Sequence, residues 1–196
     1  SGPNLTFTMK IPLKTLISFL LRAVFSWSLC LTAMAENAKP DDNLLKSGNF
    51  DENWKSAWRV QGGGEDFPQG EVALDEKVFH SPPGAVKMVQ AERINYTTLD
   101  QYVNVEPGSR YLLSGWMKCE DVQPGGGGTG PRLYVSSTAP VQRTMAVSGA
   151  VRDSQDWKKI EVPFESKDQT KVIILLMFDK AAGTAWFDDI RLTKEK

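Results

Sequence analysis

Two adjacent carboxylates, Asp188 and Asp189, lie in a segment that otherwise has the composition of a β-strand. Gly183 interrupts the preceding segment, and the residues around the two aspartates are mostly aromatic or aliphatic, as is typical of strands. Side chains alternate along a strand, which predicts Asp188 on the face that carries Ile190 and Leu192, and Asp189 on the opposite face. If Ile190 and Leu192 face the core, Asp188 points inward at the rim of the core. A buried carboxylate needs a hydrogen-bonding partner, an opposite charge or a metal ion.

Aromatic and polar side chains are predicted on the outward faces of other strands. In the segment 111–118, alternation places Tyr111, Leu113, Gly115 and Met117 in the core. It leaves Trp116 pointing outward. An aromatic ring can stack on the apolar face of a sugar ring, while Arg, Asn and Gln side chains hydrogen-bond its hydroxyl groups. The residues with this chemistry are Trp116, Tyr134, Arg132 and Tyr102, with Tyr96 on a neighbouring loop. The alternative stays open that a loop covers Trp116 and that the tyrosines are ordinary strand residues.

The sequence lacks the residue patterns of several enzyme classes. Neighbouring aspartates alternate to opposite faces of a strand, which does not suit the paired carboxylates of a glycosidase. His80 is the only histidine and has no cysteine partners for a zinc site. The glycine-rich stretch 125–131 lacks the Gly-Lys-Ser/Thr ending of a phosphate-binding loop. No Gly-x-Ser-x-Gly nucleophile motif occurs, so we expect no catalytic residues.

The N-terminal region has the pattern of a secretory signal peptide. After Met9 come two lysines, then an apolar run, then Ala33-Met-Ala35, which predicts a signal peptide at 9–35. A membrane anchor is the alternative, although the run after Arg22 is short for a bilayer span. We expect residues 1–8 to be upstream of the start, 36–42 to form a flexible leader and 43–194 to form one domain. The expected location is secreted or periplasmic.

Charge and cysteine content limit the partners and the sources of stability. The chain has 23 basic and 24 acidic residues, and residues 1–35 contain three of the basic ones, so the remainder carries 20 against 24, a formal charge of −4. A mildly acidic protein is a poor binder of nucleic acids or, after cleavage, of membranes. Cys119 is the one cysteine beyond residue 35 and cannot form an internal disulfide. We expect a monomer with an ordinary core.

Strand patterns bounded by Gly, Pro and Asn fill the rest of the chain. About ten short strands are predicted, and no segment after residue 36 shows a helical period. The predicted strand segments are 57–60, 70–74, 85–89, 100–105, 111–118, 131–137, 158–164, 171–178 and 183–192. This pattern predicts an all-β fold, an antiparallel β-sandwich of the jelly-roll type.

Four segments resemble secreted carbohydrate-binding modules of the galactose-binding-like jelly-roll type, similar to families four and nine. The segments occur in the same order as in those modules. They are 43–58 with Gly48-Asn-Phe-Asp51, 80–89 with His80-Ser81, 101–118, and the closing pair 157–164 and 183–192. The resemblance covers almost all of residues 43–192. It implies the galactose-binding-like fold, which hosts many functions.

The resemblance also implies a structural calcium ion between the first and last strands. Its ligands would be Asp51, a carbonyl near Asn49, carbonyls from His80 to Pro83, and Asp188. Such oxygen ligands suit calcium. Asp51 occupies a position where the family usually has Glu, and its side chain is one methylene group shorter. In the alternative without calcium, Asp51 caps a turn and Asp188 accepts backbone hydrogen bonds.

Taken together, these features predict non-catalytic binding of a polysaccharide or other glycan, alone or beside a separate glycan-active enzyme. Two alternatives remain: a cell-surface interaction or scaffolding sandwich without sugar binding, and a small jelly-roll polysaccharide lyase that uses Tyr134 with Arg132.

Overall fold

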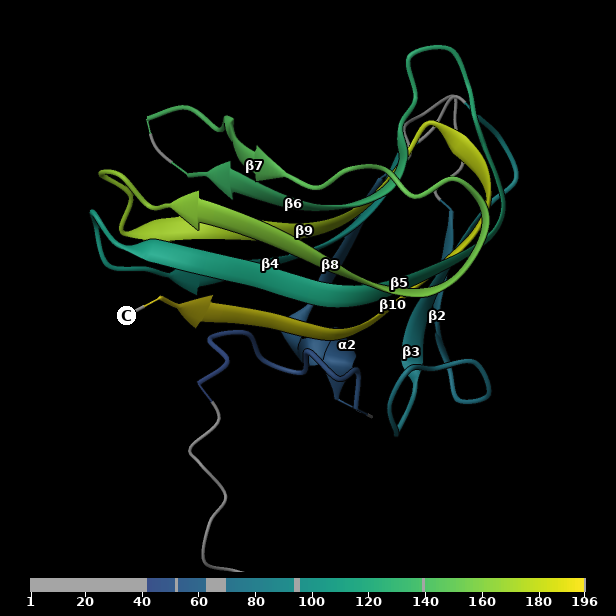
Figure 1. Ribbon diagram of the computed structural model, residues 1–196, viewed down its shortest axis with the longest axis horizontal. Coiled ribbons are helices and arrows are strands. Elements are labelled where there is room, and N and C mark those ends of the chain that lie inside the picture. The colour runs from purple at the N-terminus through teal and green to yellow at the C-terminus, as the bar shows by residue number, and fades with distance from the viewer. Residues whose placement is uncertain (1–41, 52, 63–69, 94–95, 139, 196) are drawn as a thin grey trace, which may run out of the picture. The chain divides into compact units, whose positions relative to one another are not determined.

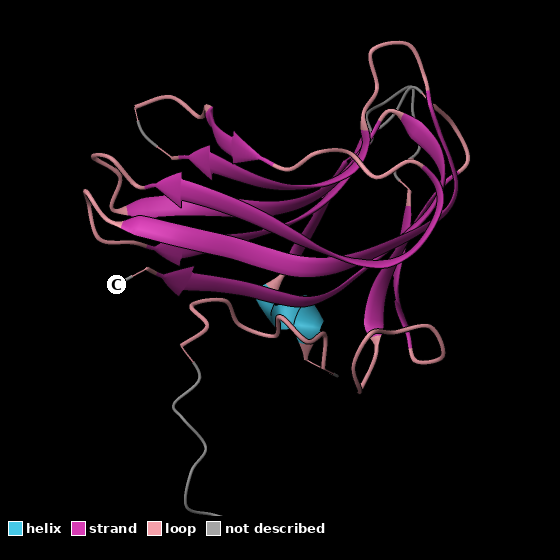
Figure 2. Cartoon of the chain, viewed as in Figure 1, coloured by secondary structure: helices cyan, strands magenta, loops and turns pink. Residues whose placement is uncertain are grey.

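The computed structural model describes residues 42–195 except 52, 63–69, 94–95 and 139. The predicted signal peptide and most of the predicted leader therefore lie outside the described residues. Within the described part, strands dominate and one short helix, α2 (Trp54–Ala57), is present (Figure 2). No described helix is long and apolar enough to cross a membrane.

The strands form two antiparallel five-stranded sheets (Figure 1). The first sheet has the order β1 (Arg59–Gly62), β4 (Tyr96–Asn104), β9 (Lys171–Asp179), β6 (Gly130–Ser137) and β7 (Thr144–Val147). The second sheet has the order β2 (Glu71–Asp75), β3 (Ala85–Gln90), β10 (Ala181–Lys194), β5 (Arg110–Pro124) and β8 (Asp153–Glu165). The predicted all-β antiparallel sandwich is confirmed.

Alternating side chains from both sheets form the core between them. In β5, Tyr111, Leu113, Gly115 and Met117 are buried, as predicted, and the intervening residues are partly exposed. In β9, the residues that face the same core are Val172, Ile174, Leu176 and Phe178, and each is fully buried. Burying one such large apolar side chain stabilises a fold by about 1.5–3 kcal/mol. The core therefore decides which face of each strand remains available for function.

Two elements were not predicted from the sequence. The helix α2 is a single turn without helical periodicity, and the prediction of no helix after residue 36 was wrong there. Trp54 is buried in this turn, and its ring packs edge-on against Phe50 at 6.4 Å between centroids. Strand β7 exists because it pairs with β6. Tertiary contacts, which have no local sequence pattern, stabilise both elements.

Residues 43–50 contain no strand but connect the two sheets. The Asn43 side chain donates to Ile190 O at 3.0 Å and accepts from Leu192 N at 2.9 Å, both in β10. The main chain adds a bond from Ile190 N to Gly48 O at 2.8 Å. On the other side, the Gln101 amide of β4 accepts from Lys46 N at 2.8 Å and donates to Lys46 O at 3.0 Å. This segment therefore links β10 of the second sheet to β4 of the first.

We expect Asn43→Ala to lower the free energy of unfolding by about 2–3 kcal/mol, because partly buried backbone groups lose their partners. Urea denaturation measures the change. Asn43→Asp, which keeps the acceptor and loses the donor, should cost less. Asn53→Ala, at a helix start without a side-chain cap bond, should change stability little. An Asn43→Ala variant as stable as the parent would contradict this role.

Candidate functional site

A β-bulge interrupts β10 at the paired aspartates. Asp188 is opposite Trp116 and Arg191 is opposite Ser114, so an additional residue is accommodated between them, and Asp189 has a φ of 49°. The bulge places Asp188 on the outer face of the second sheet while Ile190 remains in the core. The prediction that Asp188 shares the face of Ile190 was wrong, because a bulge breaks simple alternation. A Cβ at Gly115 would collide with Ile190 Cδ1, so glycine makes room for the bulge.

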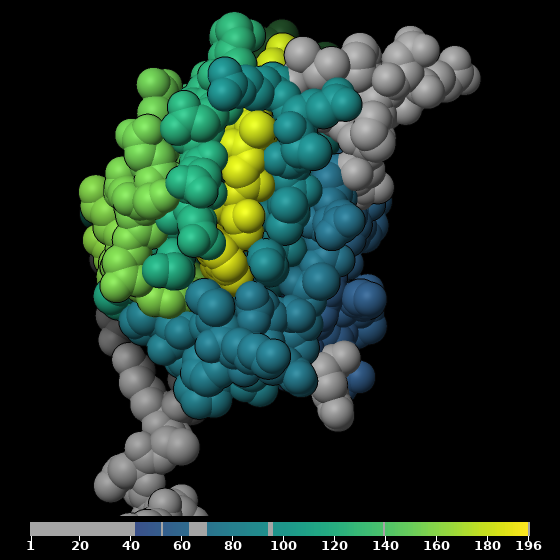
Figure 3. All heavy atoms as spheres, turned by 90° about the vertical axis from the view of Figure 1, so that its right-hand side faces the viewer, coloured from purple at the N-terminus to yellow at the C-terminus, as the bar shows by residue number. Residues whose placement is uncertain are grey.

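Asp188 is nevertheless fully buried, because the loop that carries His80 and Ser81 covers it. Its Oδ2 accepts from His80 N at 2.8 Å and Ser81 N at 2.9 Å, and its Oδ1 accepts from Asp189 N at 2.7 Å. Burial raises the pKa of Asp188, and these N–H groups oppose that shift. In Figure 3, β10 forms a strip between β3 and β5, and the β2–β3 region lies across its lower end.

The same loop also covers Trp116. The His80 ring stacks on Trp116 with centroids 3.8 Å apart, and Trp157 approaches His80 edge-on at 6.0 Å. The His80 Nδ1 lies 2.7 Å from Asp189 Oδ2, and Ser81 Oγ donates to Asp189 Oδ1 at 2.6 Å. Trp116 thus holds a loop on the second sheet.

The other four predicted sugar-contact residues lie on the first sheet. Alternation in β4 and β6 directs Tyr102, Arg132 and Tyr134 away from the core. Tyr96 is the first residue of β4, so the prediction that it lies on a loop was wrong. Across the sheet, Tyr134 of β6 and Asp100 of β4 are both in register with Leu175 of β9. Trp116, in contrast, is in β5 of the second sheet. The structure therefore brings four of the five together on the outer face of one sheet and places the fifth on another. We call this surface the β9 face.

An apolar strip runs along the centre of the β9 face. It consists of Ile173, Leu175 and Met177, the outward residues of β9, with Ile173 buried and the other two half-buried. Polar and aromatic residues border it on both sides, from β4 and from β6. Tyr102 is 48% exposed and Tyr96 is 45% exposed. The Arg59 guanidinium lies 4.7 Å from the centroid of the Tyr102 ring.

Among the residues that the structure describes, two polar atoms on this face are buried without a hydrogen-bond partner: Asp100 Oδ1 and Arg132 Nε. They lie on either side of β9, since Asp100 is in register with Leu175 and Arg132 with Met177. The other Asp100 oxygen binds the Arg59 guanidinium, with Nε at 3.1 Å. An unpartnered buried polar atom costs about 1–3 kcal/mol, so such atoms are exceptional in folded proteins.

Sequence reasoning missed Asp100. The available signal was a carboxylate between Leu99 and Gln101 at an outward position of a predicted strand, where aspartate is disfavoured.

The structure brings together three of the segments predicted to hold calcium. The segment of Asn49 reaches β10 through Gly48, and the loop from His80 to Pro83 lies on Asp188. Asn49 and Pro83 are exposed, and Asp51 Oδ1 accepts from Asn53 N at 3.0 Å. Among the described residues, no group of three or more His, Cys, Asp or Glu side chains could hold a metal. Main-chain carbonyls would therefore have to supply most ligands.

We expect Trp116→Ala to destabilise the fold without changing any glycan affinity, because Trp116 contacts the His80 loop and not the β9 face. The lost stacking and burial predict a decrease of about 1–3 kcal/mol in the free energy of unfolding. Urea denaturation and glycan titration of the same variant measure both effects. Loss of affinity in a variant of unchanged stability would assign Trp116 to the binding surface instead.

Comparison with solved structures supports the fold. The module TmCBM61, solved in complex with β-1,4-galactotriose, is 21% identical with a TM-score of 0.55, over 78% of this chain and 99% of that one. A family 16 carbohydrate binding module is 19% identical with a TM-score of 0.55, over 77% and 99%. The enzymatically active domain of bacteriophage CBA120 tailspike protein 4 is 12% identical with a TM-score of 0.64, over 80% of this chain and 22% of that one.

Two sequence comparisons complete the assignment. The tRNA nuclease WapA of Bacillus subtilis (strain 168) is 25% identical in an alignment of 162 residues, which covers 78% of this chain and only 7% of that protein. The model of the family CBM_4_9, described as a carbohydrate binding domain, matches residues 42–182. This match covers both sheets up to the start of β10. The chain therefore belongs to the CBM_4_9 family of carbohydrate-binding domains.

Proposed function

We propose that the chain binds a glycan, without catalysis, on the β9 face. The observation that carries this proposal is the apolar strip of Ile173, Leu175 and Met177, bordered by the exposed rings of Tyr102 and Tyr96. Outward polar side chains of β4 and β6 flank this strip. A sugar ring has the complementary surface, because its hydroxyl groups donate and accept at the ring edge while its C–H groups present an apolar face.

The aromatic residues of the β9 face complete the proposed site. Tyr102 and Tyr96 are exposed rings that can stack on sugar rings. Tyr134 is half-buried, and its hydroxyl is hydrogen-bonded to Thr144 Oγ1, which holds the ring in place. Binding by preformed, oriented side chains avoids part of the ordering cost of association. We further propose that the protein acts outside the cytoplasm, as a monomer, alone or beside a separate glycan-active enzyme.

We expect Arg132→Met to weaken glycan binding about tenfold or more without lowering stability. A hydrogen bond to a charged group contributes about 1.5–3 kcal/mol, and about 1.4 kcal/mol is a factor of ten. Removing an unpartnered buried atom should leave the fold equally or more stable. A glycan array followed by titration calorimetry and urea denaturation measures both quantities.

The control variant is Glu161→Gln, an exposed residue of β8 on the other sheet. Unchanged affinity in Arg132→Met would refute the assignment of the β9 face. Absence of glycan binding by the parent chain would favour the scaffolding alternative, and rising absorbance from unsaturated products on uronate polymers would favour the lyase.

We also propose a structural calcium ion held by Asp188, Asp51 and carbonyls of Asn49 and of His80 to Pro83. Two observations support it: these segments converge on β10, and burial raises the pKa of Asp188, so a cation would stabilise its charged form. In the alternative without calcium, the three N–H groups that donate to the Asp188 carboxylate compensate for its burial.

Calcium at 100 times its Kd should raise the melting temperature by about 5–10 °C. Binding at such a concentration adds about 2.7 kcal/mol to the free energy of unfolding. Each kcal/mol raises the melting temperature by about 2–4 °C for a protein of this size. Thermal melts in calcium, magnesium and EDTA test this. Asp51→Ala should abolish the shift, and identical melts of the parent in calcium and EDTA would exclude the ion.

A further inference from the structure

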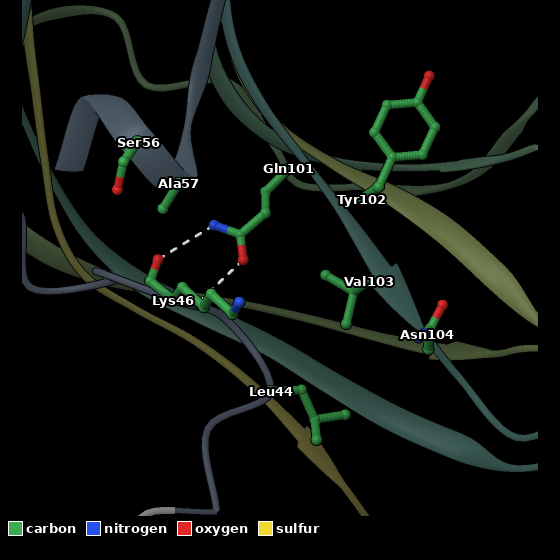
Figure 4. A pocket seen from close by; sticks show the side chains of 8 residues that line it. All are labelled: Leu44, Lys46, Ser56, Ala57, Gln101, Tyr102, Val103 and Asn104. Atoms are coloured by element: carbon green, nitrogen blue, oxygen red, sulfur yellow. Dashed lines mark hydrogen bonds between the residues drawn. The ribbon is translucent and has the colours of Figure 1, made fainter. Parts of the chain in front are cut away.

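A pocket of about 500 Å³ adjoins the β9 face at the free edge of β4 (Figure 4). The residues that line it come from the N-terminal segment, from α2 and from β4: Leu44, Lys46, Ser56, Ala57, Gln101, Tyr102, Val103 and Asn104. It is open because β1 pairs with β4 only from Thr97 to Asp100. The bonds between Gln101 and the Lys46 main chain hold one wall against β4.

The backbone of β4 directs hydrogen-bonding groups toward this pocket. Val105 N donates to Thr170 O at 3.0 Å, on the side of β9. In an antiparallel ladder the main-chain groups of successive residues point to alternate sides. The N–H and C=O groups of Tyr102 and Asn104 therefore point away from β9, toward the edge that β1 leaves uncovered.

The charge of the pocket is positive. Lys46 is the only charged residue among the described residues that line it, and none of them is acidic. Lys171 is in register with Asn104 on the adjacent strand, and Lys55 precedes Ser56 in α2. The whole chain carries a formal charge of −1, so this positive charge is local. The backbone N–H groups at the β4 edge, the Asn104 amide and the Lys46 ammonium together suit a carboxylate.

The pocket is continuous with the β9 face through Tyr102, which belongs to both. Asp100 and Asn104 are four residues apart on β4, a distance of about 13 Å at the usual rise per residue. This distance is longer than one sugar residue, so one oligosaccharide can contact both regions.

We infer that the pocket beside Tyr102 binds a uronic acid residue of the glycan, with the Lys46 ammonium and the β4 edge as its contacts. This inference rests on the proposed function of the β9 face. It names the ligand class as an acidic polysaccharide rather than a neutral one.

The test compares uronate oligosaccharides with the same compounds after reduction of each carboxyl group to an alcohol. The probes are oligogalacturonate, oligomannuronate and oligoglucuronate, titrated calorimetrically into the full chain. We expect at least one acidic form to bind about tenfold more tightly than its reduced counterpart, with a preference that decreases at high salt.

Lys46→Met should remove this preference by weakening the binding of the acidic form about tenfold, whereas Lys46→Arg should keep it. Lys158→Met, on the exposed β8 strand of the second sheet, is the matched control and should behave as the parent. Thermal melts confirm that the variants fold.

Two results would overturn the inference while leaving the proposed function intact. One is equal affinity for acidic and reduced forms. The other is an acidic preference that Lys46→Met does not change. If the parent binds no glycan at all, acidic or neutral, the proposed function fails together with the inference.

Discussion

The structure depends on the hydrogen bonds of one short segment that belongs to neither sheet. Residues 43–50 are bound to β10 through Asn43 and Gly48, and to β4 through the side chain of Gln101. Apolar packing between two sheets is non-directional and does not by itself set how their edges align. The paired bonds between Gln101 and Lys46 supply that direction. They also form the wall of the edge pocket, so the element that closes the sandwich shapes part of the proposed site.

A second constraint makes the two outer faces different. The bulge at Asp189 turns Asp188 outward, and the buried carboxylate attracts the N–H groups of His80 and Ser81. The loop then stacks on Trp116 and covers this part of the second sheet. The β9 face presents exposed tyrosines instead. One acidic side chain at a bulge thus explains why an aromatic residue that looks suited to sugar binding supports a loop.

The proposed binding face carries a local cost in stability. Asp100 Oδ1 and Arg132 Nε are buried without partners, and apolar residues at their positions would favour the folded chain. Functional sites commonly carry such a local cost in stability. The core beneath the face, from Val172 to Phe178 on the inner side of β9, is fully apolar and can sustain this cost.

The sequence by itself determined the fold class, most of the strands and their alternation outside the bulge, but not β7. Buried positions such as Leu113 and Val135, and outward positions such as Tyr102 and Arg132, follow from period-two patterning, because each strand must put its apolar side chains between the sheets. Only the tertiary structure decided which outward residues share a sheet. Trp116 and Tyr134 have the same local pattern, yet strand order places them on different sheets. The bulge at Asp189 likewise depends on residues far away in the chain, since it is defined by pairing with β5. Asp100 was visible as a carboxylate in a strand, but its surroundings depend on β1 and β9.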